Sequence, residues 1–150
     1  FHKAQIVAAR TFALYHIERG GKYKKGQFIL TNSASDQVYR GAKAAARRPN
    51  LVRAVEDTRG IVVTYDGDVV VTPYYAQSDG RTRGWEQVWG GSPKAWLTSA
   101  ADPVCDGKRK IGHGVGMPQR CAMELARQGW TFQTILKQYY QGVQLQKIYE

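Results

Sequence analysis

Apolar residues at the beginning of the chain recur with the spacing of an α-helix, and Gly20-Gly21 then interrupts the pattern. The sequence therefore predicts a helix over residues 3–19. Its apolar positions fall on two sides, which indicates a helix buried between two layers. These positions are Ala4, Val7, Ala8, Thr11 and Tyr15 on one side, and Ile6, Ala9, Ala13 and Ile17 on the other. Polar residues on such a helix need a partner or line a cavity, and this applies to Gln5, Arg10 and His16.

A run of β-branched residues marks a hairpin in the middle of the chain. Residues 61–65 and 69–72 are its predicted strands, and Asp66-Gly67-Asp68 is the turn between them. Pro73 ends the second strand or places it at a sheet edge, and Tyr74-Tyr75-Ala76 is a candidate for its continuation.

The region before the hairpin has weaker signals. Phe28-Ile29-Leu30 is a candidate short strand, and polar turn residues follow it. Residues 42–48 and 51–58 are predicted helices that Pro49-Asn50 separates, because the residue before a proline disfavours the helical conformation.

The C-terminal third has two helical patterns and a final strand. We predict helices over 119–128 and 132–141, with Gly129 ending the first and Thr131 capping the second. Apolar residues at 143, 145 and 148 suggest the last strand. Residues 1–150 are therefore predicted to form one α+β domain, with helices packed on a small, mostly antiparallel sheet.

The loop before the first of these helices is the strongest candidate for a site. In Gly112-His113-Gly114-Val115-Gly116-Met117-Pro118-Gln119, three glycines alternate with a histidine and a valine, and a proline precedes the helix. Glycine lets another group approach the backbone closely, and a helix start presents free N–H groups. The loop therefore delivers one imidazole and one amide to a polar site, or it is a strand-to-helix turn with a packed histidine.

The net charge of the chain indicates which classes of molecule it could bind. The chain of 150 residues has 22 basic and 12 acidic residues and a net charge of +10, which favours polyanions. The basic residues are spread, with small clusters at 22–25, 47–48 and 108–110, and this spread argues against nucleic acid. Apolar runs fall short of the roughly 20 residues that span a membrane. Because the chain begins inside a helical pattern without methionine, we interpret it as a fragment.

The sequence does not decide whether the two cysteines are bonded to each other. Cys105 and Cys121 match neither a CxxC pair nor zinc-ligand spacing, so they form one disulfide or are two buried thiols. Cys121 with His113 has the composition of a nucleophile and its base. However, Cys121 falls at an apolar position of a predicted helix, which favours a role in the core.

Three tryptophans lie close together after a polar glycine loop over residues 77–84. Trp85, Trp89 and Trp96 either stack on sugar rings or cap a small core, and the sequence supports both interpretations equally.

Several of these segments, taken in order, resemble the stage II sporulation protein D family, whose wider group includes the amidase enhancers. Residues 3–13 resemble the family's opening helix, and residues 78–82 are similar to its "SGGxT" loop. Residues 37–41, 54–60 and 65–67 are similar to its middle region, and residues 112–119, 125–129 and 135–142 match its C-terminal block.

The resemblance implies a lytic transglycosylase that acts on peptidoglycan strands stripped of peptides. Such an enzyme cleaves between N-acetylmuramic acid and N-acetylglucosamine and leaves a 1,6-anhydro end. The chemistry needs one carboxylic acid with a raised pKa, which protonates the leaving oxygen. The alternative is a non-catalytic glycan-binding module or an activator of a cell-wall amidase. Either protein would act outside the cytoplasm.

The sequence departs from the family pattern at informative positions. The catalytic glutamate of the family would stand immediately before Phe1, so the catalytic residue of this chain is unknown. Arg83 stands where the family often has glutamate. Some relatives bind zinc near this loop, but Tyr75 occupies the position of the histidine ligand, so we expect neither a metal nor another cofactor.

The resemblance also implies which residues line the groove. We expect Gln5, Tyr75, Ser78, Thr82, His113 and Gln119 to contact substrate. Gln5, Ser78 and Gln119 would hydrogen-bond to N-acetyl and hydroxyl groups, and His113 would contact sugar or orient a neighbour. Thr82 and Arg10 favour structural roles.

Overall fold

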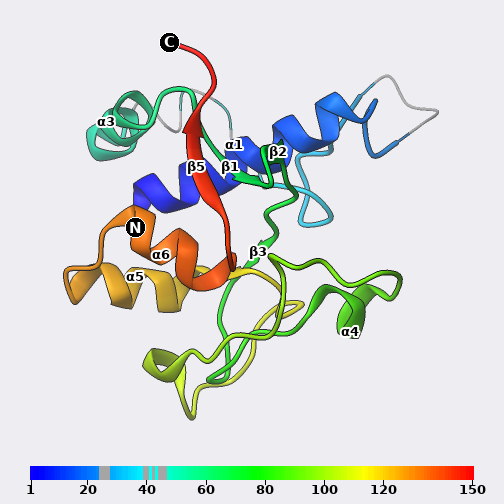
Figure 1. The fold of residues 1–150 in the computed structure, drawn as a ribbon. Coiled ribbons are helices and arrows are strands. Elements are labelled where there is room, and N and C mark those ends of the chain that lie inside the picture. Colours follow the sequence, from blue (N-terminus) through cyan, green and yellow to red (C-terminus); the bar gives the residue numbers. More distant parts are fainter. Residues whose placement is uncertain (24–27, 39–40, 42, 44–46) are drawn as a thin grey trace.

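The computed structural model describes residues 1–23, 28–38, 41, 43 and 47–150 (Figure 1). A three-stranded antiparallel sheet has β1 (Ile61–Tyr65) at its centre, between β2 (Asp68–Val69) and β5 (Gln144–Lys147). Thr64 pairs with Val69 across the hairpin, and Val63 pairs with Leu145 of β5. The predicted hairpin and last strand are confirmed, although the second strand is shorter than predicted and ends at Val69.

The first helix, α1 (His2–Glu18), packs against β1 and against the helices on either side of it. Its buried face consists of Ala4, Val7, Ala8 and Thr11, as the first apolar stripe predicts. The Thr11 hydroxyl accepts a hydrogen bond from the Val63 amide at 3.0 Å, which ties the helix to the sheet. The second stripe is not buried between layers, since Ile17 is 52% exposed.

Arg10 of α1 is partly buried and needs hydrogen-bond partners, and it finds them in backbone carbonyl groups, not in a carboxylate. Its guanidinium donates to the carbonyl oxygens of Thr58 at 2.5 Å and Ile61 at 2.9 Å. Thr58 follows α3 (Pro49–Asp57), so the cation lies at the negative end of that helix. Arg10 is therefore structural, as the sequence favours.

The region before the hairpin departs from two local predictions. The second helix begins at Pro49 rather than at residue 51, because the missing N–H of proline costs nothing in the first turn of a helix. The candidate strand over Phe28-Ile29-Leu30 does not form: among the described residues, the Ile29 carbonyl accepts from the Lys22 amide, and the side chain of Phe28 stays 52% exposed. The predicted helix over 42–48 falls largely outside the described residues.

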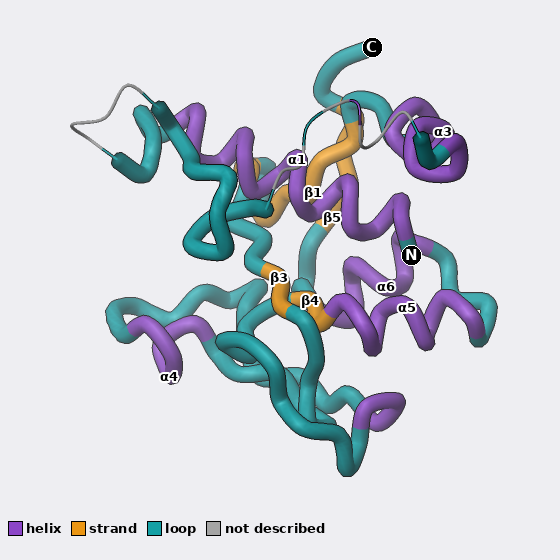
Figure 2. Tube along the Cα trace, turned by 180° about the vertical axis from the view of Figure 1, so that it is seen from behind, coloured by secondary structure: helices purple, strands orange, loops and turns teal. Residues whose placement is uncertain are grey.

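The part of the molecule beyond the sheet consists mostly of loops (Figure 2). β3 (Tyr74–Tyr75) does not extend the hairpin but pairs in parallel with β4 (Met117–Pro118). Two short helical segments, α4 (Trp85–Trp89) and the 3-10 turn η1 (Pro103–Cys105), lie between them in the sequence. Three of the residues that the family resemblance selects, Ser78, Thr82 and His113, lie in these loops.

Two helices close the core below α1. They are α5 (Gln119–Arg127) and α6 (Phe132–Tyr139), and Thr131 caps α6 by accepting from the Thr134 amide, as predicted. Ile135, Leu136 and Tyr139 are fully buried against α1 and the sheet. The α+β class with a small, mostly antiparallel sheet is confirmed.

Candidate functional site

The opening helix and the glycine loop meet at a pair of glutamines. The side-chain amide nitrogen of Gln119 donates a hydrogen bond to the side-chain oxygen of Gln5 at 3.1 Å, although the two residues are 114 positions apart in the sequence. Gln119 is the first residue of α5, and Pro118 in β4 precedes it as N-cap. The opening helix and the glycine loop are therefore in contact at this point, but neither glutamine is among the residues that line the cavity described below.

Close backbone contacts give the glycine loop its shape. Gly116 has a φ of +76°, and a side chain there would overlap the carbonyl oxygen of Pro73. The next residue, Met117, donates its amide to that same carbonyl at 3.2 Å. Glycine at 116 therefore permits the β3–β4 pairing that positions Gln119.

His113 stabilises this loop by hydrogen bonds between both of its ring nitrogens and the backbone. Its Nδ1 accepts from the Val115 amide at 3.1 Å, so the proton belongs on Nε2, which donates to the carbonyl of Tyr74 at 3.1 Å. Burial lowers the pKa of His113 below its ordinary value, which keeps the ring neutral. Since both nitrogens are occupied, His113 shapes the site and is a poor candidate for proton transfer.

An aromatic groove with a cavity of about 480 Å³ opens between α1, α4 and the glycine loop. We define it by its ring-bearing residues, which are Phe12, His16, Tyr74, Tyr75, Trp85, Trp89 and His113. The ring centres of Trp85 and Trp89 lie 4.5 Å apart, those of Trp89 and His113 4.8 Å, and those of His113 and Tyr75 5.3 Å. The rings form a continuous wall, and Trp89 is 45% exposed.

The sequence left open whether the three tryptophans stack on sugar rings or cap the core, and the structure gives different answers for different tryptophans. Trp85 and Trp89 line the groove, whereas the indole N–H of Trp96 donates to the Val71 carbonyl at 2.9 Å and its ring packs against the core. His16 is one of the polar residues that the sequence predicts to need a partner or line a cavity, and the structure places it in the groove lining. The contribution of Phe12 was missed. Its signal was the helical spacing of positions 5, 9, 12 and 16, which places Phe12 on one face with Gln5 and His16.

Among the described residues that line the groove, Asp36 is the one that carries a carboxylate. It accepts from Lys22 at 2.6 Å, from the Tyr23 hydroxyl at 2.8 Å, and from Thr31. Burial alone would raise the pKa of Asp36, but the hydrogen bonds from Lys22, Thr31 and Tyr23 outweigh it and hold that pKa well below its usual range. Asp36 therefore stays ionised and cannot serve as a general acid near neutral pH.

Ser78 and Thr82 lie outside the groove lining and contact protein groups. The buried Ser78 hydroxyl donates to Asp102, whose other carboxylate oxygen accepts from Tyr139 at 2.9 Å. Thr82 is also buried and accepts from the Ala100 amide at 2.8 Å. Both residues join loops behind the site, so their predicted contact with substrate has no geometric support here.

Tyr75 lies between the groove and this buried cluster. Its ring borders the cavity beside His113, and its hydroxyl is buried with no hydrogen-bond partner among the described residues. Burial raises the pKa of Tyr75, so the phenol stays protonated. The hydroxyl is closed off from solvent, so it is the ring of Tyr75 that borders the groove.

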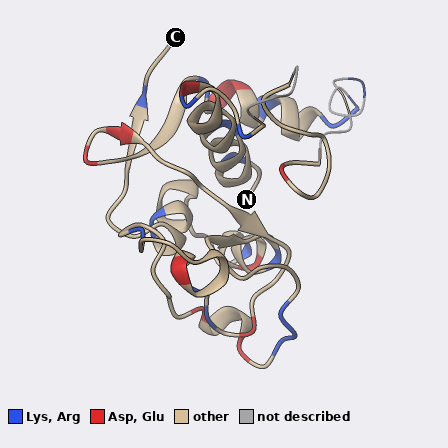
Figure 3. Ribbon diagram, turned by 90° about the vertical axis from the view of Figure 1, so that its right-hand side faces the viewer, with Lys and Arg blue, Asp and Glu red and all other residues tan. Residues whose placement is uncertain are grey.

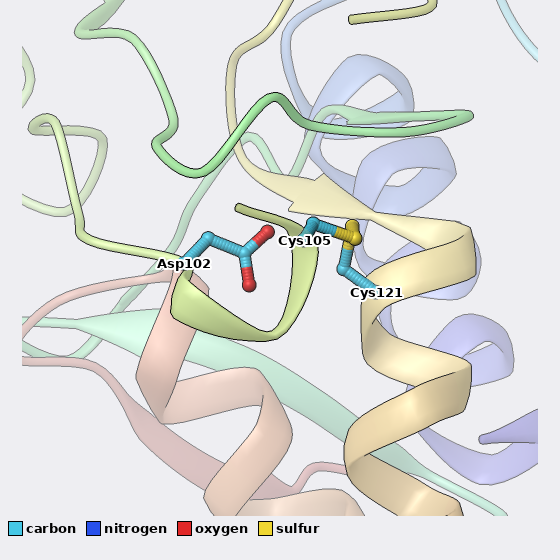
Figure 4. Close-up of side chains that lie close together, drawn as sticks. All are labelled: Asp102, Cys105 and Cys121. Atoms are coloured by element: carbon cyan, nitrogen blue, oxygen red, sulfur yellow. A yellow bond between two sulfur atoms is a disulfide. The ribbon is translucent and has the colours of Figure 1, made fainter. Parts of the chain in front are cut away.

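Cys105 and Cys121 form a disulfide, which resolves the alternative in the sequence. Their Cα atoms are 5.8 Å apart, and the bond joins η1 to the first turn of α5 (Figure 4). Asp102 lies beside the two sulfurs, and these three residues together could otherwise offer metal ligands. Because the sulfurs are bonded to each other, neither is a thiolate that can ligate a metal or act as a nucleophile.

Comparison with known proteins adds evidence for the first part of the chain. Residues 1–65 match the family model described as Stage II sporulation protein. The resemblance to this family is confirmed. Its model covers α1, α3 and β1, and therefore includes Gln5 and the helical face that lines the groove.

The chain is also similar to two curated proteins. The chain is 38% identical over 88 residues to an uncharacterized protein of Brachyspira hyodysenteriae, covering 59% of this chain and 23% of that protein. It is 31% identical over 90 residues to the amidase enhancer of Bacillus subtilis, covering 60% of this chain and 11% of that protein. The chain thus spans less than a quarter of the length of either relative.

Within the part of the chain that the structure describes, each helix is too short or too polar to cross a bilayer.

Proposed function

We propose that this chain acts on peptidoglycan outside the cytoplasm, as a glycan-binding domain of the lytic transglycosylase class. The aromatic groove carries this proposal. Its wall of rings offers flat apolar faces beside polar groups, which suits the two faces of a sugar. The family match over α1 and the likeness to an amidase enhancer support a role at the cell wall. The disulfide supports the location, because disulfides persist in oxidising compartments.

Bond cleavage requires a carboxylic acid that the described groove residues do not provide. Asp36 is held ionised, and His113 has both nitrogens occupied. From the resemblance, we expect the acid immediately before Phe1. The Gln5–Gln119 contact lies one helical turn from Phe1, because the backbone amide of Gln5 donates to the Phe1 carbonyl at 3.1 Å. We propose that a glycan strand in the aromatic groove, which Phe12 and His16 line farther along α1, extends to this end of the helix and meets the acid there.

The exposed ring of Trp89 gives the first test. Trp89→Ala should weaken binding of peptide-free glycan strands about tenfold, because a stacked ring contributes about 1 kcal/mol or slightly more. Titration calorimetry or tryptophan fluorescence measures the affinity. Trp130→Ala is the matched control, since Trp130 is 41% exposed and lies between α5 and α6. Equal losses in both variants would contradict binding in the groove.

Product analysis tests cleavage. We expect a chain extended with a glutamate directly before Phe1 to release 1,6-anhydromuramyl products from peptide-free glycan, and the same extension with glutamine to release none. If both extended chains bind glycan but neither cleaves it, the transglycosylase proposal is wrong.

The relative named amidase enhancer favours a second candidate function in that case. This chain would then stimulate a cell-wall amidase without cleaving glycan itself. An unchanged amidase rate after mixing the two proteins would exclude it.

A further inference from the structure

A basic loop runs directly into the glycine loop. Lys108, Arg109 and Lys110 follow η1, and all three side chains are exposed. Gln77 holds this loop in place from the strand side. Its backbone exchanges hydrogen bonds with Ile111 at 2.9 and 3.1 Å, and its side-chain amide donates to the carbonyl of Arg109 at 2.7 Å.

Arg120 adds a fourth cation from α5. Its guanidinium donates to the side-chain oxygen of Gln77 at 3.2 Å, and its amide donates to the Ala76 carbonyl at 3.0 Å. Gln77 therefore positions Arg120 and the basic loop together. Lys108 and Arg120 line one cavity of about 440 Å³. We call Lys108, Arg109, Lys110 and Arg120 the basic patch.

The acidic groups near the basic patch are mostly engaged elsewhere. Asp79 pairs with Arg83 at 2.8 Å, and Glu124, which borders the same cavity, pairs with Arg127 at 3.1 Å. Asp106 is exposed and accepts from the Gly107 amide. Within the described ranges, the four cations of the patch have no ion pair, so the patch is positive. Figure 3 shows both basic and acidic residues on the loops that lie farthest from the C-terminus.

The basic patch is continuous with the aromatic groove. Lys110 donates to the Gly112 carbonyl at 2.9 Å, and its charge contributes to lowering the pKa of His113 after the larger effect of burial. A polymer that leaves the groove past His113 therefore reaches the patch.

We propose that the basic patch binds carboxylates carried by the same glycan strand that lies in the groove. This inference rests on the proposed function. The planar fork of arginine matches a carboxylate, and lysine adds a point charge. The patch would thus make the domain select glycans with anionic sugars over neutral ones. Phosphate groups share this oxyanion chemistry, but the continuity with the sugar-binding groove favours a charge on the glycan itself.

Binding of two forms of one glycan tests the inference. The probes are peptide-free peptidoglycan strands and the same strands with their carboxylates converted to neutral amides. We expect the unaltered chain to bind the native form about tenfold more tightly at low salt, with the preference shrinking as salt screens the charges. The variant Lys108→Glu/Arg109→Glu should lose this preference and keep its affinity for the amidated form.

The matched control is Arg47→Glu/Arg48→Glu. It reverses two adjacent exposed charges beside α3 and should keep the preference. Equal losses in the two double variants would overturn the inference, because only net charge would then matter. A loss of affinity for the amidated strand in Lys108→Glu/Arg109→Glu would also overturn it, because the loop would then act structurally.

Two further outcomes separate the hypotheses. If the unaltered chain binds both strands equally, the inference falls and the groove proposal stands. If it binds neither strand, the proposed function falls, and the inference falls with it. Tight binding of a polyphosphate chain that survives Trp89→Ala would assign the patch to a separate phosphate polymer, and would overturn the inference as well.

Discussion

Gly116→Ala is expected to destabilise the fold by about 3 kcal/mol or more, through strain at a left-handed backbone position and overpacking. The added methyl group would overlap the carbonyl oxygen of Pro73 and approach the ring of Tyr140 to 3.1 Å. The first obstacle is backbone, so a change of rotamer cannot relieve it. Either β3 and β4 separate, or the loop abandons its conformation. Urea unfolding followed by circular dichroism measures the change in midpoint.

Gly107→Ala separates the clash from the backbone strain. Gly107 also has a positive φ, of +70°, but a methyl group there would meet nothing within 4 Å. Its replacement should cost only about 1 kcal/mol, the penalty of a left-handed conformation for a residue other than glycine. If the two variants have equal unfolding midpoints, the proposed role of Gly116 in the close β3–β4 approach is wrong.

Removal of the disulfide is the second large effect that we expect. Cys105→Ala/Cys121→Ala should lower the free energy of unfolding by about 3 kcal/mol, because the bond closes a loop with a sequence separation of 16 and restricts the unfolded chain. The bond also anchors η1 to α5. The turn before Cys105 contains Asp102, which holds Ser78 and Tyr139, so the loss should loosen the loops behind the site.

The reductant itself provides the control for this prediction. Unfolding and refolding in dithiothreitol reduces the disulfide of the unaltered protein, which should then unfold at a lower urea concentration than before the treatment. The double variant has no disulfide to reduce, so it should unfold at the same urea concentration with and without dithiothreitol. A native protein that is insensitive to this treatment would contradict a stabilising disulfide. Melting of the variant alone, without this comparison, would not distinguish a lost cross-link from poor packing.

Local chemistry in the sequence predicted most of the elements. The turn at Asp66-Gly67 needs two residues with positive φ and has values of +50° and +86° there, so the hairpin could be predicted from those residues. The cap at Thr131 and the buried stripe of α1 were equally local. The strand predicted at 28–30 failed because an apolar run forms a strand only when a partner is available, and the sequence does not show whether one is.

The candidate site depends on contacts between segments far apart in the sequence. Motif resemblance selected Gln5 and Gln119, which the structure brings into contact, and His113, which lines the groove. It also selected Ser78 and Thr82, which the structure buries behind the loops. Phe12 was overlooked, because a helical stripe has the same spacing whether it faces a core or a cavity. The two roles differ only in what lies opposite the helix.

By itself, the sequence determined the helices α1, α5 and α6, the hairpin, the positive charge and the family resemblance, because each depends on residues close together in the chain, on composition or on a motif. The tertiary structure alone decided three things. It joined Cys105 to Cys121, it occupied both nitrogens of His113, and it placed Trp89 at a groove and Trp96 in the core. Each of these outcomes depends on which distant segment packs opposite the residue, and a local pattern of residues carries no information about that.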